Sequence, residues 1–298
     1  MKKSQTILLT GATGFLGSYL LEALLAQGHK VVILKRSTSD TWRIESLLNR
    51  VVSYDVDVSP LDLAFEQQHI DVVIHTACQY GRSGEPISQI VDSNLMFGLR
   101  LLDASLKFNV DTFFNTDTFF NTDGVLQKYL NVYILSKKQF VEWLKQQSTK
   151  IRVINLKLEH VYGPNDGDTK FVSWVISQLK EKVEEIKLTK GEQKRDFIYI
   201  DDVVSAYLTT LEKAQDLVGF NEFDVGTGRL VSVKSFIQLL MKVFEDRFGE
   251  SLTELNFGAV AYREGEVMEF CVDNSALMKI GWQPTVDLEA GLNATIQG

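Results

Sequence analysis

A glycine-rich turn near the start of the chain, Gly11-Ala-Thr-Gly-Phe-Leu-Gly17, is the feature that most restricts how this sequence can fold. An apolar run over residues 7–9 precedes the turn and predicts a short buried strand. Apolar residues recur at helical spacing over residues 15–24, Gly28 stands where that helix would end, and residues 31–34 predict a second strand. The first glycine permits a tight turn, the second lets a pyrophosphate approach the backbone, and the third lets helix and strand pack closely. The pattern therefore predicts a dinucleotide-binding fold, with ligand contacts from Gly11, Thr13, Gly14, Phe15, Leu16 and Gly17.

The composition limits the classes of partner. The 298 residues suffice for one large domain or two modest ones, and 45% of them are hydrophobic, so a sizeable core can be buried. A net charge of −8 argues against nucleic acid or an anionic membrane surface as the main partner. No apolar stretch is long enough to span a bilayer, and the apolar run that follows Met1 belongs to the expected strand rather than to a signal peptide. Cys78 and Cys271 lie far apart, which predicts reduced thiols in a cytoplasmic protein.

The first half of the chain alternates between strand and helix patterns. Strands are expected at 72–74, 113–114 and 152–158, and helices at 95–108 and 133–146. This alternation predicts an α/β fold with a Rossmann-type doubly wound parallel sheet. A break at 162–168 divides a dinucleotide-binding domain (residues 1–165, joined by a returning segment near 197–229) from a smaller α/β substrate-binding lobe (residues 166–298).

A tandem repeat makes one candidate residue ambiguous. The hexapeptide Asp-Thr-Phe-Phe-Asn-Thr occupies residues 111–116 and again residues 117–122. This unit is too short for a repeat architecture. It nevertheless offers two threonines, Thr116 and Thr122, for the same role.

Tyr133 and Lys137 form a Tyr-x-x-x-Lys pattern inside an expected helix. Their spacing is about one helical turn, so the two side chains lie on one face. An ammonium group near a phenol lowers the pKa of the phenol, which equips the pair to exchange a proton at a carbonyl or alcohol. The pattern also fits a surface helix with an exposed lysine, but beside a dinucleotide-binding turn it favours catalysis. Tyr129 is the competing tyrosine, and position 133 offers it no lysine.

Ordered motifs along nearly the whole chain resemble the extended short-chain dehydrogenase/reductases that act on nucleotide sugars. The motifs are the turn with Thr10, Ile74-His-Thr-Ala77, Asn94, Val161-Tyr-Gly-Pro164, Arg195-Asp-Phe-Ile-Tyr-Ile-Asp-Asp-Val203, Val225-Gly-Thr-Gly228, Arg263-Glu-Gly-Glu266, Asp273 and Gly281-Trp-Gln-Pro284. Three further segments look most like the CDP-abequose synthase type of 4-ketoreductase, which serves deoxysugar and O-antigen biosynthesis: Asn115-Thr-Asp-Thr-Phe-Phe120, Leu158-Glu-His-Val-Tyr-Gly-Pro164 and Gly191-Glu-Gln-Lys-Arg-Asp-Phe197. The resemblance implies an oxidoreductase that reduces the C4 ketone of a nucleotide-linked 4-keto-deoxyhexose.

The resemblance assigns the catalytic triad to Thr116, Tyr133 and Lys137. The short gap between Thr116 and Tyr133 is similar to that subgroup and favours Thr116 over Thr122. In this role Thr116 would hydrogen-bond the substrate oxygen, Tyr133 would transfer the proton, and Lys137 would tune Tyr133 and hold the nicotinamide ribose.

Three other residues are expected at the substrate by the same resemblance. Related 4,6-dehydratases carry Thr-Asp-Glu at this strand, whereas Thr118 stands here in place of the glutamate, so dehydration is disfavoured. Asp117 is a relic, a ligand of a substrate hydroxyl, or a structural residue at the strand end. His160 replaces an asparagine common in relatives; it is expected to line the site against cofactor or sugar, and the alternative is a packed loop histidine.

The second strand ends in Lys35, Arg36 and Ser37, where NAD-binding relatives usually place an aspartate. A guanidinium suits a 2′-phosphate, which favours NADPH over NADH; the alternative is a solvated basic turn. Asp55 or Asp57, with the valine that follows, is expected to flank the adenine. By resemblance the cofactor site also includes these residues: Val56, Thr76, Ala77, Asn94, Tyr133, Lys137 and His160.

Arg195 and Arg263 match two family arginines that grip the substrate diphosphate. Arg195 could instead pair with Asp196, Asp201 or Asp202. No metal site is expected, and the resemblance implies a homodimer formed through the helices near 95–108 and 133–147. Two rival interpretations remain: a nucleotide-sugar 4-epimerase with tightly bound NAD, which would be expected to carry an acidic residue at the end of the second strand, and a non-catalytic dinucleotide sensor, which would not need the triad.

Overall fold

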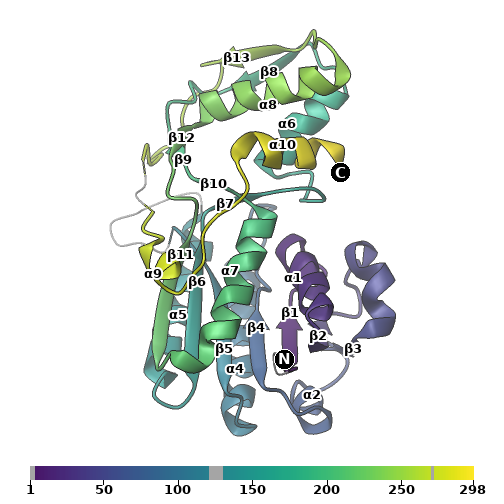
Figure 1. Ribbon diagram of the computed structural model, residues 1–298, viewed down its shortest axis with the longest axis vertical. Helices are drawn as coiled ribbons and strands as arrows, with labels where there is room; N and C mark the ends of the chain where they lie inside the picture. Colours follow the sequence, from purple (N-terminus) through teal and green to yellow (C-terminus); the bar gives the residue numbers. More distant parts are fainter. Residues whose placement is uncertain (1–3, 121–129, 270–271) are drawn as a thin grey trace.

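The structure is a computed structural model, and it describes residues 4–120, 130–269 and 272–298. Seven parallel strands form one sheet in the order β11-β6-β5-β4-β1-β2-β3 (Figure 1). The strands are β1 (Thr6–Thr10), β2 (Lys30–Lys35), β3 (Val52–Asp55), β4 (Val72–His75), β5 (Thr112–Thr118), β6 (Arg152–Leu158) and β11 (Phe220–Val225). The strand order reverses between β1 and β4, and sheets of this kind bind ligands at the carboxyl ends beside that point. The predicted Rossmann-type fold is confirmed.

Helices cover both faces of the sheet. On one face α1 (Phe15–Ala26) packs against α7 (Ile200–Lys213), and on the other α4 (Phe97–Lys107) packs against α5 (Asn131–Gln147). Successive β1 residues therefore enter different clusters, with Leu9 on the α1 side and Leu8 on the α4 side. Burial on both faces explains why the strands are near-continuous apolar runs rather than alternating ones.

Helix α1 ends at the glycine that the sequence marks. Gly28 has a φ of +80°, in the left-handed region that favours glycine. Its N–H donates to the carbonyl of Leu25 (3.2 Å), and the N–H of His29 donates to that of Leu24 (3.1 Å). These bonds satisfy carbonyls that the helix end would otherwise leave open.

The helix expected over 95–108 is divided. Helix α3 (Ile87–Val91) leads into one π turn, Asp92–Met96, and α4 begins only at Phe97. Asn94, in the π turn, is fully buried; its side chain accepts from the N–H of Gln79 (2.7 Å) and donates to the carbonyl of Gln79 (2.8 Å). Such turns are frequent at functional positions, and this one fastens the segment after β4 to the helices.

A second lobe lies beyond the carboxyl ends of the strands (Figure 1). Its elements are β8 (Glu185–Leu188) paired with β13 (Glu254–Phe257), β9 (Lys194–Arg195) paired with β12 (Val231–Ser232), and helices α6 (Phe171–Lys180), α8 (Val233–Phe248) and α10 (Leu288–Gln297). Between this lobe and the sheet, β7 (His160–Tyr162) pairs with β10 (Phe197–Tyr199) (Figure 1). The remaining short elements are η1 (Trp42–Arg50), α2 (Asp62–Gln67), η4 (Ala214–Asp216) and α9 (Ser275–Lys279).

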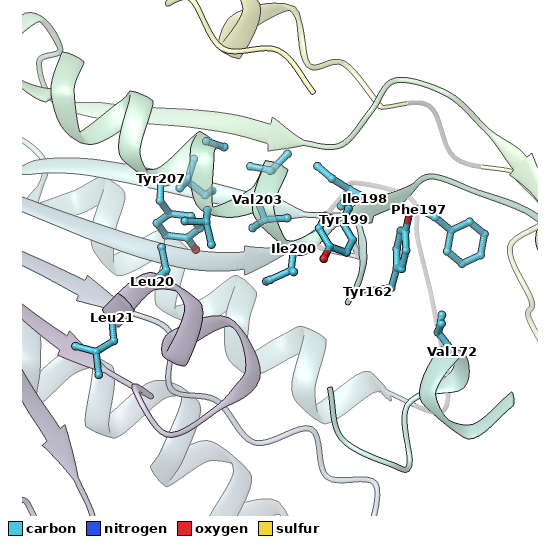
Figure 2. Close-up of a cluster of buried hydrophobic side chains, with 14 of the residues drawn as sticks. Leu20, Leu21, Tyr162, Val172, Phe197, Ile198, Tyr199, Ile200, Val203 and Tyr207 are labelled. Atoms are coloured by element: carbon cyan, nitrogen blue, oxygen red, sulfur yellow. The ribbon is translucent and has the colours of Figure 1, made fainter. Parts of the chain in front are cut away.

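One hydrophobic cluster continues from the sheet into the second lobe. Figure 2 shows Leu20 and Leu21 of α1 near Tyr207 of α7, and beyond them Phe197 of β10 and Val172 of α6. The same cluster reaches α8 and α10. The two lobes therefore share a core, and the division at residues 165 and 166 stays a prediction.

Two sequence expectations concern cysteine and membranes. Cys78 is a free, exposed thiol, and Cys271 lies outside the described residues. Among the helices of the described ranges, none combines the length and apolar character that a membrane crossing requires.

Candidate functional site

The glycine-rich turn has the backbone of an anion site. Gly11 has a φ of +71°, and a Cβ on it would lie 2.6 Å from Oγ1 of Thr76. A Cβ on Gly17 would lie 2.0 Å from the carbonyl oxygen of Gly11, so both positions require glycine. Gly14 is the N-cap of α1, no side chain of the described residues caps this end, and the first turn has no acidic residue. The N–H groups of Phe15 and Leu16, which follow Thr13 and Gly14 at the start of α1, are therefore suited to bind an anion.

Thr76 and Ala77 lie beside this turn because they follow β4. Oγ1 of Thr76 donates to the carbonyl of Thr10 (2.7 Å), and the N–H of Ala77 donates to Oγ1 of Thr10 (3.3 Å). The Thr10 hydroxyl also bonds Nδ1 of His75 (2.8 Å). Burial, with a smaller effect of Lys137, lowers the pKa of His75 to about 3, so its imidazole is neutral. These bonds tie the ends of β1 and β4 together at the point where the strand order reverses.

The end of β2 leaves one cation exposed. Lys35 forms an ion pair with Asp55, and both the N–H and the hydroxyl of Ser37 donate to the carboxylate of Asp57 (2.7 Å each). The guanidinium of Arg36 is exposed and makes no hydrogen bond or ion pair with the part of the chain that the structure describes. Val56 continues from β3, and its N–H donates to the carbonyl of Lys35 (2.9 Å).

Tyr133 and Lys137 lie on α5, and both are buried, with 5% and 2% of their surfaces exposed. The amine of Lys137 donates to the backbone carbonyl of Thr116 (2.8 Å), so the end of β5 and the helix meet here. Asn94 contacts the same helix, because its amide donates to Oγ of Ser136 (3.1 Å), which stands between Tyr133 and Lys137 in the sequence. The Thr116 side chain points elsewhere, since its hydroxyl bonds that of Tyr207 on α7 (2.6 Å).

The Tyr133 hydroxyl instead has Thr118 as its neighbour. Burial, together with Tyr80, Cys78 and Asp117, raises the pKa of Tyr133 well above its usual value, and a hydrogen bond from the Thr118 side chain acts against that rise. The ring of Tyr80 lies 4.9 Å from that of Tyr133, centre to centre. The phenol is therefore protonated in this arrangement, rather than poised as a phenolate by Lys137 as the sequence suggested.

Asp117 holds the end of β5. Its carboxylate accepts from the N–H of Thr118 (2.8 Å) and from the amide of Asn155 on β6 (3.1 Å). Asn155 in turn accepts from Asn115 (2.7 Å) and donates to Glu222 (2.8 Å). Of the three roles left open for Asp117, these contacts match the structural one.

His160 begins β7 next to a buried carboxyl group. Oε2 of Glu159 lies 3.5 Å from Nδ1 of His160, and Nδ1 is buried with no hydrogen-bond partner among the described residues. The imidazole ring lies 4.5 Å from the ring of Phe119 and 5.7 Å from that of Phe197. Burial, with Arg195 and Arg82, lowers the pKa of His160 to about 3. The histidine is neutral, and a quarter of its side chain (27%) is still exposed.

An ion pair joins Arg195 to the late segment that contains Arg263. The buried guanidinium of Arg195 pairs with Glu266, three residues after Arg263, and donates to the carbonyl of Lys194 (2.7 Å). The side chain of Arg263 is exposed. Arg195 pairs with an acidic residue that the sequence had not suggested, whereas Asp196 accepts from Thr227 and Gly228 instead.

The family model of the NAD-dependent epimerase/dehydratases matches residues 7–226. The chain belongs to this family. It is 36% identical to a CDP-abequose synthase of Salmonella typhimurium over 98% of this chain and 97% of that protein. A CDP-abequose synthase of Salmonella muenchen is 35% identical, over 97% and 96%.

Solved structures give the same family. A UDP-glucose 4-epimerase of Thermotoga maritima, solved with UDP-glucose, has a TM-score of 0.82 at 25% identity, covering 98% of this chain and 97% of the other. A UDP-glucuronic acid 4-epimerase of Bacillus cereus, solved with UDP-glucuronic acid and NAD, has a TM-score of 0.80 at 27% identity, covering 98% of each chain. The chain thus spans its epimerase/dehydratase relatives almost end to end.

The sequence did not identify several residues that lie near the candidate site. They are Tyr80 beside Tyr133, Tyr207 beside Thr116, Glu159 beside His160, Glu266 on Arg195, and Arg43, whose Nε donates to the carbonyl of Asn165 (2.9 Å) next to the glycine-rich turn. Glu159 stood in a motif that the sequence analysis quoted, but its burial was not expected, because acidic side chains are rarely buried. Tyr207 meets Thr116, and Glu266 meets Arg195, only in the folded chain. Nothing in the local sequence indicates either contact. In the described ranges no group of histidine, cysteine or acidic residues could hold a metal ion; Thr122 and Tyr129 lie outside those ranges.

Proposed function

We propose that this protein reduces the C4 ketone of a nucleotide-linked 4-keto-deoxyhexose, with NADPH as the reductant. The observation that carries the proposal is the similarity to CDP-abequose synthases along almost the entire length of both chains. The composition and the family are consistent with work in the cytoplasm.

The cofactor region fits a dinucleotide. The tight turn at Gly11 and Gly17, with the open N-terminus of α1, suits a pyrophosphate, and Thr76, Ala77 and Asn94 would line its path toward α5. Arg36 supports NADPH, because its exposed guanidinium could make charge-assisted bonds to a 2′-phosphate. When bound, NADPH supplies the hydride that the reduction needs.

The chain's own residues would supply the proton and the orientation. Tyr133 is the donor to the C4 oxygen, and its raised pKa keeps the phenol protonated until a developing alkoxide needs it. Lys137 holds the end of β5 through the carbonyl of Thr116 and would contact the nicotinamide ribose. A strand-end threonine would bond the same oxygen: the family resemblance favours Thr116, and the contacts favour Thr118.

Arg195 and Arg263 would bind the diphosphate, away from the reacting carbon, with Glu266 holding Arg195 in place. Binding energy gained there can orient the sugar for reduction.

The main alternative is a nucleotide-sugar 4-epimerase, and the 4-epimerase structures of similar fold favour it. An epimerase must recover its hydride, so it would be expected to retain NAD tightly. The end of β2 carries Lys35, Arg36 and Ser37 rather than an acidic residue, which argues for exchangeable NADPH. A non-catalytic dinucleotide sensor is the third possibility, and it would not need Tyr133 and Lys137.

One assay separates the three. The purified protein is tested for bound NAD, and then for oxidation of added NADPH with CDP-, dTDP-, UDP- and GDP-linked 4-keto-6-deoxyhexoses. The proposal requires cofactor-free protein and oxidation that depends on one of these sugars. Retained NAD with interconversion of 4-hydroxy sugars would establish the epimerase, and dinucleotide binding without any turnover would establish the sensor.

We also propose that the protein forms a homodimer through α4 and α5. Helix α5 carries the exposed side chains of Leu135 and Trp143. Leu135 lines an apolar hollow together with Ile87 and Val91 of α3. Burial of that surface would stabilise a second copy. Light scattering of Leu135→Asp should show a shift to monomer if this face is the interface, and an unchanged mass would exclude it.

A further inference from the structure

The sheet face that α5 covers changes from apolar to polar toward the ends of β5 and β6. Phe113 and Val153 are paired there in the apolar core. Two residues further along each strand, Asn115 and Asn155 are again opposite one another and fully buried, and Asp117 follows with 3% of its surface exposed. A buried polar side chain costs stability unless it is hydrogen-bonded. The contacts among these side chains therefore decide what they contribute.

Asn155 lies at the centre of these contacts and uses both ends of its amide. Its oxygen accepts from the amide of Asn115 (2.7 Å), and its NH₂ group donates to the carboxylates of Asp117 (3.1 Å) and Glu222 (2.8 Å). The reverse orientation would set the amide oxygen against both carboxylates, so the neighbours fix which way the group points. One amide thus joins β5, β6 and β11.

Lys157 holds Glu222 at the edge of the sheet. The Lys157 amine lies 3.2 Å from the carboxylate of Glu222 and 2.9 Å from that of Asp224. Lys157 follows Asn155 by two residues on β6, so both side chains lie on the same face. The ammonium group offsets the negative charge of Glu222. Asn155 is therefore anchored on β11, the side away from β5.

Asp117 connects this anchor to the end of β5. One of its carboxylate oxygens accepts from Asn155, and the other accepts from the backbone N–H of Thr118 (2.8 Å). Thr118 is the last residue of β5, and its side chain is the hydrogen-bonding neighbour of Tyr133. The place of Thr118 beside the phenol therefore depends on Asp117, and the place of Asp117 depends on Asn155.

We propose that Asn155 is a positioning residue for proton transfer: its bond to Asp117 holds the end of β5 where Thr118 meets the phenol of Tyr133. Asn155 is fully buried, so it acts through Asp117 rather than by contact with the sugar. A displacement of about 1 Å at the reacting groups can cost on the order of 100-fold in rate, even from a distant substitution. The choice of Tyr133 as proton donor rests on the proposed function, whereas the bond between Asn155 and Asp117 does not.

Asn155→Asp tests the contact, because aspartate keeps the shape of asparagine and puts an oxygen where the NH₂ group met two carboxylates. We expect single-turnover oxidation of NADPH to slow roughly 10-fold or more, with KM for the sugar nucleotide changed less than about 3-fold. The solvent isotope effect in heavy water should rise, because slower proton transfer limits the rate more strongly. Asn221→Asp on β11 is the matched control, since that asparagine donates to backbone carbonyls such as that of Val218 (3.1 Å). An unchanged rate and isotope effect in Asn155→Asp would overturn the proposal.

Exchange of the two partners separates position from charge. The background is Glu222→Gln, because glutamine can accept from asparagine or donate to aspartate at position 155. In this background, Asn155→Asp together with Asp117→Asn rebuilds the bond in reverse at constant net charge, and the amide oxygen at position 117 still accepts from the N–H of Thr118. We expect the exchange to recover most of the rate that Asn155→Asp alone loses. A rate that stays low in the exchanged protein would overturn the proposal, since the Asp117 carboxylate itself would then be required.

Hydrogen exchange follows the end of β5 without any turnover. In protein labelled with nitrogen-15 threonine, Thr118→Val identifies the backbone signal of Thr118. Its N–H should exchange with heavy water roughly 10-fold faster in Asn155→Asp, the factor expected for one weakened charge-assisted bond, and slow exchange should return in the exchanged protein. Unchanged exchange in Asn155→Asp would overturn the role of Asn155. Failure of the proposed function has a different signature, because the wild type would then reduce none of the 4-keto sugar nucleotides, and the N–H exchange would still decide whether Asn155 holds the strand end.

Discussion

The hydroxyl of Thr116 lies 2.6 Å from the hydroxyl of Tyr207, on the opposite face of the sheet from the helix that carries Tyr133. Side chains alternate along a strand, so Thr116 follows Phe114 toward α7, where Phe114 and Tyr207 also stack with ring centres 6.4 Å apart. The carbonyl of Thr116, rather than its hydroxyl, reaches Lys137 (2.8 Å). Thr118, the last residue of β5, instead has the Tyr133 side chain as a hydrogen-bonding neighbour, which acts to lower the pKa of Tyr133.

Valine substitutions distinguish the two threonines, because valine keeps the shape and removes the hydroxyl. We expect Thr118→Val to lower kcat roughly 10-fold or more, since it removes the hydroxyl beside the proton donor. Thr116→Val should act mainly on stability, because it leaves the buried Tyr207 hydroxyl without its partner, at a cost of about 1–3 kcal/mol. Steady-state kinetics and urea unfolding of both variants provide the comparison. A larger loss of kcat from Thr116→Val, with stability unchanged, would restore the assignment that the family resemblance favours.

Removal of the Tyr133 hydroxyl should abolish most turnover and leave the fold intact. The ring of Tyr133 is buried and contacts Tyr80, so phenylalanine preserves the packing while the proton donor is lost. The loss of a positioned acid typically costs on the order of 10²–10⁴-fold in rate. Single-turnover oxidation of NADPH and a separate NADPH titration measure the two properties. Tyr129→Phe is the matched control, since position 133 offers that tyrosine no lysine; near wild-type turnover in Tyr133→Phe would refute the mechanism.

The sheet and the turn could be predicted because their signals are local. The spacing of apolar residues marked the strands and helices of the first half, and Gly11, Gly17 and Gly28 occupy conformations or contacts that only glycine tolerates. The π turn at Asn94 could not be predicted, because it depends on side-chain bonds to Gln79, which is distant in sequence.

The environment of the candidate site depends more on the whole fold. Glu266 is 71 residues from Arg195, and the late segment lies beside β9, where the N–H of Lys194 donates to the carbonyl of Met268 (2.7 Å). The Thr116 side chain shares a face of β5 with Phe114, and its contact with Tyr207 depends on α7, which comes about 90 residues later and covers that face only in the folded chain. The pKa of Tyr133 was expected to fall on account of Lys137, but that argument omitted burial, which is the largest effect.

Arg36→Asp should shift cofactor preference from NADPH toward NADH. The substitution removes the exposed guanidinium at the end of β2 and supplies a carboxylate able to accept bonds from ribose hydroxyls. Loss of a charge-assisted bond of about 1.5–3 kcal/mol corresponds to roughly 10- to 100-fold in NADPH affinity. Kinetic constants for both cofactors test this, with Arg247→Asp, an exposed arginine on α8, as the control for charge alone. A wild type that already prefers NADH would show that Arg36 has been assigned wrongly.

Arg263→Ala should weaken binding of the nucleotide diphosphate far more than binding of NADPH. Arg263 lies in the second lobe's late segment, which Glu266 fastens to Arg195, and an Arg–phosphate contact is bidentate and directional. Loss of this contact should cost roughly 10- to 100-fold in affinity, and Arg263→Lys should recover part of it because the charge remains. Separate titrations of nucleotide diphosphate and NADPH make the comparison. Equal weakening of both ligands would indicate misfolding, and unchanged nucleotide affinity would show that Arg263 does not bind the diphosphate.

Glu159→Gln should become progressively more stable than the wild type as the pH rises. Burial raises the pKa of Glu159 to about 9 in the folded protein, above its ordinary value of 4.5. Between those values the unfolded chain releases the proton while the folded chain keeps it, so the wild type loses up to about 1.4 kcal/mol of stability per pH unit from this group. Glutamine does not titrate, and below pH 4.5 the two proteins should differ least. Urea unfolding at pH 5.5, 7.0 and 8.5 measures the difference, with exposed Glu250→Gln as the control. A constant difference across this range would mean that Glu159 is already ionised in the folded protein at these pH values.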